Sequence, residues 1–454
     1  MKIKSIFIIL ALMLFGATMA SAEADGYIVK FKTVPSGLDT AIFEEIIPEE
    51  GLYRVESLDS ISGYQDYIQF TEADAPVEIH LPDAPQPKVS LMSIPDDNIY
   101  PEQWALNMVK AEFAWENETY GNEIRVAVID SGCYPHGDLG DNLLEGKNYL
   151  DNTTDTSDDH GHGTHVAGII AAGMNGRGTV GVAPKAKIVP IKIMSATDSC
   201  TMSKVARAIR DCVDVFGCRV INMSWGIPSK NSTLKSALDH AYKKGVILVS
   251  AVGNDGIADR SYPAAFDNVI GVGAVDETKL KSSFSRFNES VDIMAPGTKI
   301  LSTFLDNQYA YMDGTSQASP HIAAIAALAL SAEPELTNGE FYSILTETAE
   351  DLGDDGKDTF YGCGLVDTQA LFGRIFQKKD YYISPTNTQD GKSFYLVRNT
   401  SDAPLTLDSY FAKYDGERLV SATRDAITLN PDQAVTFVQV TSRHFLWDNM
   451  SPLK

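Results

Sequence analysis

The chain has 454 residues and a mass of 49.4 kDa, so two or three structural units are expected rather than one domain of about 100–200 residues. Hydrophobic residues make up 44% and charged residues 22%, proportions that exclude a mainly disordered or collagen-like chain. With 37 Lys and Arg against 61 Asp and Glu the net charge is −24, which argues against a nucleic-acid partner because phosphate binding needs clustered positive charge.

The first 22 residues have the features of an export signal. Lys2 and Lys4 supply positive charge at the start, and the apolar run that follows is too short to span a bilayer. The small residues Ala20, Ser21 and Ala22 suit a signal peptidase, so cleavage is expected after Ala22. An uncleaved membrane anchor is the alternative, and it is disfavoured because no long apolar extension follows. The mature chain is therefore expected to be secreted, with no membrane span and with attachment to the cell surface left open.

Residues 23–90 form a separate acidic unit. They contain 14 acidic residues against four basic ones, which gives a net charge of −10. An alternating apolar segment at 27–31 predicts a strand in a small α+β unit. Prolines at positions 82, 85 and 87 then indicate an extended linker to the next domain.

Strands and helices alternate through residues 91–376. Apolar runs of strand length are found at 124–129, 188–193, 220–223, 246–249, 269–275 and 291–294. Helical periods are found at 202–215, 234–243 and 316–330. This alternation is typical of an α/β domain in which helices cover both faces of a mostly parallel sheet. In such domains functional residues lie at the carboxyl ends of the strands.

Residues 377–454 carry short strand-like runs, at 393–397 and 434–438, and predict a small β-sandwich-like domain. The five cysteines of the chain are too few and too scattered for a disulfide-dense scaffold. Because their number is odd, at least one thiol has no partner within the chain, and the connectivity of any disulfides stays open. Their spacing does not indicate a zinc site.

Three short segments contain the side chains that acyl transfer needs. Asp130 ends a predicted buried strand, His162 begins a predicted helix, and Ser316 opens the alanine-rich helix at 316–330. A serine hydroxyl is a poor nucleophile until a histidine takes its proton, and a carboxylate must hold that histidine in the right tautomer. A helix start also favours negative charge that develops beside it.

These segments resemble the motifs of the subtilase family of serine endopeptidases, over roughly residues 95–372. The order Asp, His, Ser is the family's. The resemblance implies that Asp130 is the orienting acid, His162 the general base and then acid, and Ser316 the nucleophile. It also implies that Asn254 donates its side-chain amide to the oxyanion, together with the backbone N–H of Ser316. Four further histidines are interpreted as structural: His136, His160, His165 and His321.

In the family, an extended peptide substrate pairs through its main chain with two edge segments. The resemblance implies that these segments are Met194-Ser195-Ala196 and Ser224-Trp225-Gly226. It implies a primary pocket with walls of Gly226, Ala251 and Gly253, and with Ser261 near its base. No Asp aligns with the pocket floor, so strict specificity for basic side chains is not indicated. Asp255 at the pocket rim is an alternative means of accommodating a Lys or Arg side chain.

The resemblance also implies a structural calcium ion bound by Asp97, Asp138 and Asn175, because calcium favours carboxylate, amide and carbonyl oxygens. The alternative is that these are ordinary polar residues of loops. No catalytic cofactor is expected. Two positions differ from the family or stand out beside its motifs. Gln317 follows the nucleophile where Met is common, and Cys133 lies close to Asp130, where its thiol is either reactive or packed and inert.

The sequence as a whole predicts a secreted, bacterial, monomeric serine endopeptidase of broad specificity, made as a proenzyme that processes itself. Its substrates are proteins or peptides, and the 23–90 unit is expected to help folding and to inhibit the enzyme until it is cleaved off. Two alternatives stay open. One is a dedicated processing protease for a single exported precursor, and the other is a catalytically dead surface-binding protein. Cleavage of casein separates the first from the leading reading, and labelling of Ser316 by a fluorophosphonate separates the second.

Overall fold

The structure is a computed structural model that describes residues 26–77 and 102–376 with their side chains, and residue 377 by its backbone. Beyond them it describes seven backbone segments, at 381–389, 392–399, 404–415, 418–430, 434–440, 444–448 and 451–452. The predicted export signal, the proline-containing linker and the predicted calcium ligand Asp97 lie outside the described residues.

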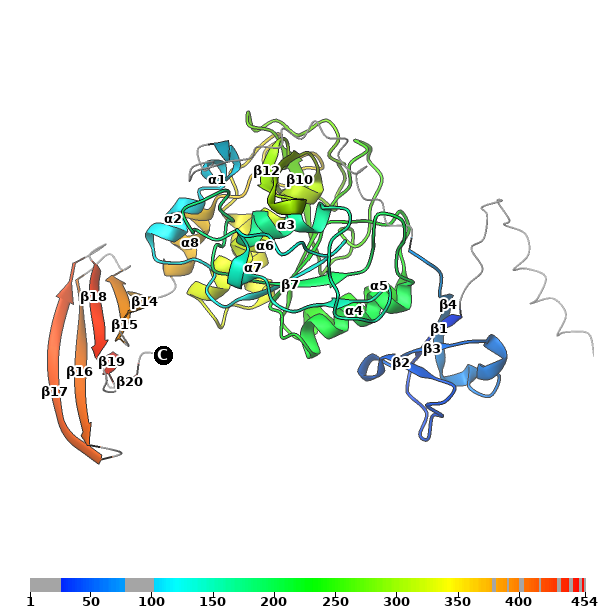
Figure 1. The fold of residues 1–454 in the computed structure, drawn as a ribbon, viewed down its shortest axis with the longest axis horizontal. Coiled ribbons are helices and arrows are strands. Elements are labelled where there is room, and N and C mark those ends of the chain that lie inside the picture. The colour runs from blue at the N-terminus through cyan, green and yellow to red at the C-terminus, as the bar shows by residue number, and fades with distance from the viewer. Residues whose placement is uncertain are drawn as a thin grey trace, which may run out of the picture.

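A parallel sheet of seven strands, in the order β11-β10-β9-β8-β5-β7-β6, forms the centre of the largest domain (Figure 1). Its strands are β5 (Arg125–Asp130), β6 (Lys147–Asn148), β7 (Lys187–Lys192), β8 (Val220–Met223), β9 (Ile247–Ala251), β10 (Ile270–Val275) and β11 (Ile293–Pro296). The predicted parallel α/β domain and its six predicted strands are therefore confirmed. Strand β6 was not predicted, because two residues are too few to show a periodic pattern.

Eight α-helices lie within the described residues 102–377. They are α1 (Trp104–Met108), α2 (Ala111–Glu116), α3 (His162–Ala171), α4 (Met202–Asp214), α5 (Ser232–Lys243), α6 (Thr315–Ala332), α7 (Asn338–Glu347) and α8 (Thr368–Gln377). A hairpin of β12 (Ile300–Thr303) and β13 (Tyr309–Met312) precedes α6. The three predicted helices correspond to α4, α5 and α6.

Alternate side chains of each central strand face different helices, as the period of a strand requires. On β5, Val126 and Val128 pack in the cluster that contains α3 and α6. Ala127 and Ile129, which point the other way, pack in the cluster that contains α4 and α5. The sheet is therefore buried on both faces, which explains why its strands are almost continuously apolar.

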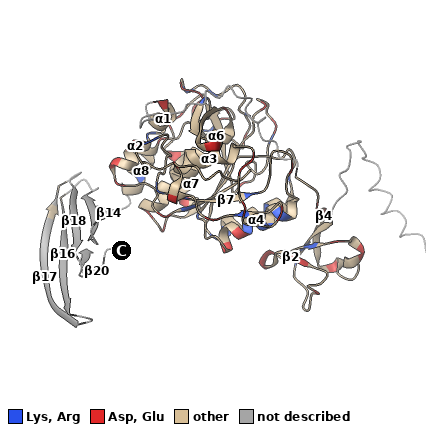
Figure 2. Ribbon diagram, in the orientation of Figure 1, with Lys and Arg blue, Asp and Glu red and all other residues tan. Residues whose placement is uncertain are grey.

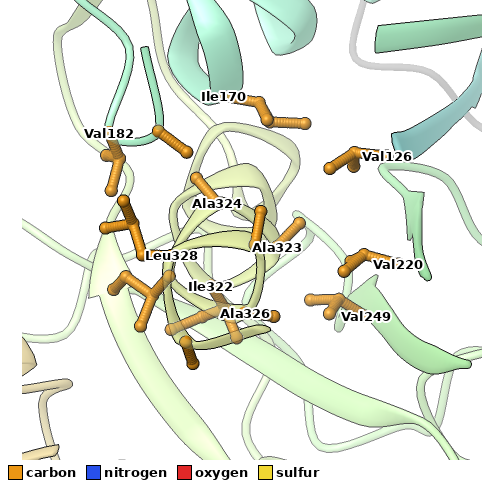
Figure 3. Packing of buried hydrophobic residues seen from close by; sticks show 14 of the residues in the cluster. Val126, Ile170, Val182, Val220, Val249, Ile322, Ala323, Ala324, Ala326 and Leu328 are labelled. Atoms are coloured by element: carbon orange, nitrogen blue, oxygen red, sulfur yellow. The ribbon is translucent and has the colours of Figure 1, made fainter. Parts of the chain in front are cut away.

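Helix α6 runs through the core and is buried along nearly its whole length. Its small residues Ala323, Ala324 and Ala326 allow the backbone to approach the strands closely, and Ile322 and Leu328 fill the larger gaps (Figure 3). Val126, Val220 and Val249 of the sheet and Ile170 of α3 surround it. This packing holds the start of α6, and with it Ser316, in a fixed place at the edge of the sheet.

The N-terminal unit is an antiparallel sheet of four strands in the order β2-β3-β1-β4. The strands are β1 (Tyr27–Phe31), β2 (Glu44–Ile47), β3 (Leu52–Val55) and β4 (Ile68–Ala73). Its predicted helical part is wrong for the described residues 26–77, whose helices are the short 3₁₀ segments at 48–50, 58–61 and 65–67. Each is ended within a turn by the next strand or by a residue such as Gly51, which has a left-handed conformation (φ 68°).

The N-terminal unit lies against α4 and α5 through acidic side chains. Glu72 of β4 accepts hydrogen bonds from the backbone N–H groups of Ser232 and Thr233, the first residues of α5, at 2.9 and 3.1 Å. Asp74 accepts from the N–H and the hydroxyl of Ser203 in the first turn of α4, at 2.9 and 2.6 Å. Carboxylates at helix starts satisfy unpaired N–H groups and interact favourably with the helix dipole.

Charge also joins the two units along the exposed side of α4. Arg207 donates to the Glu44 carboxylate at 2.7 Å, and Arg210 donates to the Ile46 carbonyl at 2.8 Å. Figure 2 shows the basic residues on α4 and the acidic residues on the neighbouring β2. The acidity of the N-terminal unit, noticed in the sequence, therefore has a local partner in this chain.

The last part of the chain consists of antiparallel strands in two sheets. One sheet has the order β14-β15-β18, and the other has the order β17-β16-β19-β20. The strands are β14 (Tyr381–Gln389), β15 (Lys392–Asn399), β16 (Leu405–Asp415), β17 (Arg418–Leu429), β18 (Ala434–Val440), β19 (His444–Asp448) and β20 (Ser451–Pro452). The two strand-like runs named from the sequence lie in β15 and β18, and a β-sandwich domain stays a prediction. Within the described residues, no helix combines the length and apolarity that crossing a membrane requires.

Candidate active site

Asp130 and His162 form a buried hydrogen-bonded pair. The Nδ1–H of His162 donates to Asp130 Oδ1 at 2.8 Å, and both side chains are 0% exposed. Asp130 is the last residue of β5, and His162 is the first residue of α3, so the pair joins the carboxyl edge of the sheet to a helix start. This bond fixes the histidine tautomer and leaves Nε2 as the basic nitrogen. Nε2 has no hydrogen-bond partner among the described residues.

The environment of His162 makes it a stronger base than an ordinary histidine. Burial by itself lowers the pKa of His162, but the Asp130 carboxylate, through its charge and its hydrogen bond, raises it, and Asp158 adds to the rise. The resulting pKa lies above the ordinary value of 6.5. A neutral imidazole with a raised pKa is suited to taking a proton from a hydroxyl.

Asp158 holds the turn that leads into α3. Its Oδ1 accepts from the Ser131 hydroxyl and from the N–H groups of His160 and Gly161, at 2.9, 3.0 and 2.9 Å. Its Oδ2 accepts from the N–H and hydroxyl of Thr164, at 2.9 and 2.6 Å. The sequence reasoning did not name Asp158, although an acidic residue shortly before a helix is a known signal for a capping role.

Ser316 lies in the first turn of α6, where a buried polar network surrounds it. Its hydroxyl donates to the Ser224 carbonyl at 2.9 Å, and the Ser224 hydroxyl donates to the Ser316 carbonyl at 2.8 Å. Asn222 extends the network by donating to the Ser224 hydroxyl at 2.9 Å and accepting from Ser319 at 2.7 Å. The residue predicted to be the nucleophile is therefore tied to the end of β8, which carries one predicted substrate segment.

The side chain of Asn254 is oriented by Thr315. Asn254 Oδ1 accepts from both the N–H and the hydroxyl of Thr315, each at 2.8 Å, so its Nδ2 faces the other way. A Cβ atom added at Gly314 would lie 3.4 Å from Asn254 Nδ2 and 3.5 Å from the Ser316 backbone nitrogen. Both predicted oxyanion donors therefore border one small space, which the missing side chain of Gly314 keeps open.

The two predicted edge segments differ in how the structure uses them. Ser224, Trp225 and Gly226 follow β8, and Ser224 lies beside Ser316 as expected. Met194, Ser195 and Ala196 lie in a tight turn instead, in which Ser195 N–H donates to the Asp198 carbonyl at 2.8 Å.

The stretch that pairs with the chain leaving the N-terminal unit comes about five residues later, at 199–201. Val77 N–H donates to the Cys200 carbonyl at 2.9 Å, the Ser199 hydroxyl donates to the Val77 carbonyl at 2.7 Å, and Pro76 forms an antiparallel bridge with Thr201. Residues 199–201 were missed because local composition does not show which part of a loop runs extended at an edge.

The predicted pocket residues partly come together. A Cβ atom added at Gly226 would lie 2.1 Å from the Ser261 hydroxyl, so Gly226 and Ser261 are in direct contact. Ala251 is buried at the end of β9. Gly253 has a φ of 111°, a conformation that favours glycine, and the side chain of Arg286 lies against it. Arg286 was not named from the sequence.

The predicted calcium ligands do not assemble a metal site among the described residues, which contain no group of three or more acidic, histidine or cysteine side chains able to hold a metal ion. Asp138 is buried, and its Oδ2 accepts from Thr179 N–H at 2.9 Å. Asn175 Oδ1 accepts from Arg177 N–H at 3.2 Å. Calcium takes six to eight oxygen ligands, and the third predicted ligand, Asp97, lies outside the described residues, so the calcium site stays a prediction.

Two departures from the family are placed clearly. Gln317 is 0% exposed, and neither atom of its amide has a hydrogen-bond partner in the described structure. Its Oε1 lies 2.6 Å from the position of a Cβ added at Gly314, so it borders the same space as the oxyanion donors. Cys133 is the packed and inert alternative: burial, with Asp158 and Asp130 nearby, raises the pKa of its thiol well above the ordinary value.

Three of the four histidines interpreted as structural are buried, and their hydrogen bonds agree with that role. His165 Nε2 donates to the carbonyls of Ile300 and Ala310, at 3.1 and 2.9 Å. His321 Nδ1 donates to the Gln317 carbonyl at 2.8 Å. His136 Nε2 donates to a loop carbonyl at 3.1 Å.

Comparison with known proteins identifies the family to which this fold and these motifs belong. A model described as the subtilase family matches residues 121–364. The chain belongs to the subtilase family. Subtilisin Savinase of Lederbergia lenta is 38% identical over 267 residues, which are 59% of this chain and 97% of that protein. Minor extracellular protease Epr of Bacillus subtilis (strain 168) is 40% identical over 270 residues, which are 59% of this chain and 41% of that protein. This subtilase is a serine endopeptidase, as its motifs predict.

Proposed function

We propose that this subtilase is a secreted endopeptidase that hydrolyses peptide bonds through Asp130, His162 and Ser316. The buried 2.8 Å bond between His162 Nδ1 and Asp130 is the observation that carries the proposal, because it leaves Nε2 basic and unpartnered at the sheet edge. A missing partner alone does not distinguish His162, because Nδ1 of His165 is also buried without one. His162 differs in that a buried carboxylate holds its other nitrogen and raises the pKa of the imidazole, whereas burial lowers the pKa of His165.

In the proposed mechanism, Ser316 Oγ attacks the carbonyl carbon of the peptide bond while His162 Nε2 takes its proton. The Ser316 hydroxyl now donates to the Ser224 carbonyl. An incoming peptide that pairs with the strand end at Ser224 offers an N–H to that carbonyl and frees the hydroxyl to turn to His162. His162 then passes the proton to the leaving amine, and water hydrolyses the acyl-enzyme by the same steps in reverse order.

The oxyanion that forms during each attack is stabilised, in this proposal, by Asn254 Nδ2 and the backbone N–H of Ser316. Thr315 fixes the Asn254 amide through two hydrogen bonds of 2.8 Å, so the donor needs no reorganisation when charge develops. A preorganised donor of this kind contributes about 3–4 kcal/mol to lowering the barrier.

We also propose that the N-terminal unit is a propeptide that inhibits the enzyme and is removed by it. Glu72 and Asp74 dock the unit on the starts of α5 and α4, and Val77 then lies along the edge strand at Cys200. Main-chain pairing of this kind is how an extended peptide binds an exposed strand. The same pairing, with no demand on side chains at each position, supports broad specificity for protein or peptide substrates.

Secretion and a monomeric state complete the proposal. The amino-terminal features of an export signal support secretion, and the name of one relative, minor extracellular protease Epr, agrees with it. Attachment to the cell surface through the C-terminal strands stays a further prediction.

The proposal of a structural calcium ion rests on the family resemblance alone. Equal melting temperatures of the purified protein with and without a chelator would show that it binds no stabilising calcium ion.

The test compares wild type with Ser316→Ala on casein and on the chain's own N-terminal unit. Wild type should degrade casein and lose its N-terminal unit, and Ser316→Ala should do neither, because removing a triad serine costs about 10⁶ in kcat. Asp306→Ala, at an exposed position of the 305–307 segment, serves as a control for substitution itself. Equal activity of wild type and Ser316→Ala would overturn the proposal, and a wild type that leaves casein intact would favour a dedicated processing protease.

A further inference from the structure

The guanidinium group of Arg286 joins two stretches of the predicted substrate pocket. Its Nε and Nη2 atoms donate to the two carboxylate oxygens of Asp255, at 2.6 and 2.7 Å. Its Nη1 atom donates to the carbonyls of Asp259 and Arg260, at 3.4 and 3.0 Å. These carbonyls come just before Ser261, the predicted base of the pocket. Arg286 therefore ties the base of the pocket to the residue that follows the predicted oxyanion donor.

The stem of Arg286 lies against the opposite side of the same segment. A Cβ atom added at Gly253 would lie 2.7 Å from both Cδ and Nε of Arg286, and Arg286 N–H donates to the Gly253 carbonyl at 3.1 Å. Gly253 and Asp255 flank Asn254. A substrate whose attacked carbonyl contacts Asn254 brings the side chain of that residue close to both neighbours, so their charge affects which side chains bind.

The ion pair between Arg286 and Asp255 is bidentate and partly buried. The Arg286 side chain is 13% exposed and that of Asp255 is 47% exposed. The hydrogen bond from Arg286 holds the pKa of the Asp255 carboxyl below its ordinary value, and its charge acts in the same direction. Asp255 is therefore ionised, with its charge balanced by two parallel N–H···O bonds. The neighbouring pair of Arg260 and Glu289 is more exposed and is joined by a single contact between Nη2 and Oε1.

We propose that Arg286 is a specificity-determining residue of this active site, because its pairing with Asp255 cancels a negative charge that otherwise attracts Lys or Arg side chains of the substrate. The inference rests on the proposed function of Ser316 and its neighbours. It reverses the sequence-based alternative in which Asp255 accommodates basic side chains. The attacked carbonyl belongs to one residue of the substrate. If that residue carries a cationic side chain, the side chain meets an ion pair with no net charge and binds little better than an uncharged side chain.

The test measures kcat/KM for two peptides that differ only in carrying Lys or Leu at that residue, and uses their ratio. Arg286→Met frees the Asp255 carboxylate and should raise the Lys-to-Leu ratio about three- to fivefold, the size of one exposed charge interaction. Asp255→Asn leaves Arg286 unpaired and should lower the ratio by a similar factor. The double variant should return to within about twofold of wild type, because both charges are gone. The ratio cancels any general loss of activity.

Matched controls separate this role from a structural one. Arg260→Met removes the same charge from the neighbouring exposed pair and should leave the ratio within about twofold of wild type. Arg286→Lys keeps the charge and should also stay close to wild type. Added salt should shrink the gain of Arg286→Met, because exposed charges are screened.

An unchanged ratio in both Arg286→Met and Asp255→Asn would overturn the inference. If Arg286→Met does not fold, Asp255→Asn still tests it through an exposed side chain. If the wild-type protein cleaves neither peptide and does not react with a fluorophosphonate, the proposed function itself fails. If wild type cleaves both peptides and all variants share its ratio, the role of Arg286 alone fails.

Discussion

Val77 donates its backbone N–H to the carbonyl of Cys200 over 2.9 Å, so the chain leaving the N-terminal unit pairs through its main chain with the peptidase domain. Its direction is set by two contacts. Glu72 bonds to Ser232, whereas Val77 lines a cavity of about 220 Å³ with Ile227. As the residue number rises from 72 to 77 in this segment, the number of the neighbouring residue falls from 232 towards 224. The two chains therefore run antiparallel.

This direction locates the bond that self-processing is expected to cut. If the peptide continues extended from Val77 near Ile227, we expect the fourth residue of that stretch to reach Ser224, because extended chains advance about 3.3 Å per residue. Ser224 is bonded to the hydroxyl of Ser316. Counting from Val77 gives the bond between His80 and Leu81. N-terminal sequencing of the mature protein should begin at Leu81, and a start near residue 90, where the sequence placed the boundary, would contradict this register.

Activity should rise with pH through an inflection above 6.5. His162 must be neutral to accept the proton of Ser316, and its pKa is raised by the Asp130 carboxylate against the opposing effect of burial. The enzyme is therefore inactive below this raised pKa and active above it. The measurement is kcat/KM against pH with a neutral peptide. Asp130→Asn should lower kcat by about 10⁴ because the histidine tautomer is lost. An acid limb with its inflection well below 6.5 would show that His162 is not the base.

Stability should fall on acidification below about pH 6.5. Burial lowers the pKa of His165 to about 3 and that of His321 to about 4, so the folded protein binds fewer protons than the unfolded chain in this range. Their contribution to stability is complete above the unfolded pKa of about 6.5 and is lost as the pH falls towards the folded values. Each histidine adds a slope of at most about 1.4 kcal/mol per pH unit.

Urea unfolding of the Ser316→Ala chain at pH 7, 6 and 5 measures this slope without self-digestion. His321→Gln replaces a titrating side chain by a neutral one of similar reach and should make the fall in stability shallower. His160→Gln is the comparison: burial also lowers the pKa of His160, but His160 is only partly buried, so this variant should change the slope less than His321→Gln. Identical slopes for the parent and His321→Gln would exclude His321 as a source of acid sensitivity.

Oxidation should spare the residue beside the nucleophile. Gln317 is buried next to the predicted oxyanion donors, and it has no sulfur for peroxide to convert into a polar sulfoxide. Wild type should keep most of its activity under a mild peroxide treatment that inactivates its Gln317→Met variant. Cys133 is a poor competitor, because burial raises the pKa of its thiol. Equal rates of inactivation in a Cys133→Ser background would show that position 317 does not govern sensitivity to peroxide.

The sequence predicted the parts of this molecule whose information is local. Strand β5 and helix α6 show their apolar periods within a few residues, and Asp130, His162 and Ser316 stand at the ends of such elements. Contacts between distant segments were not predictable in this way. The pairing of Arg286 with Asp255 spans 31 residues, and the docking of Val77 on Cys200 depends on how a whole unit packs. Which residues of the 194–201 loop pair with an extended chain was likewise not predictable, because a turn and a paired edge segment have similar polar composition.

Labelling with a fluorophosphonate, followed by peptide mapping, tests the central claim most directly. The claim is that Ser316, activated by the pair of His162 and Asp130, is the nucleophile of this subtilase. The reagent should attach to Ser316 in the wild-type mature protein, and the rate should follow the neutral form of His162 as the pH rises. His162→Ala should remain essentially unlabelled over the same time. Modification at another serine, or equal labelling of wild type and His162→Ala, would contradict the account.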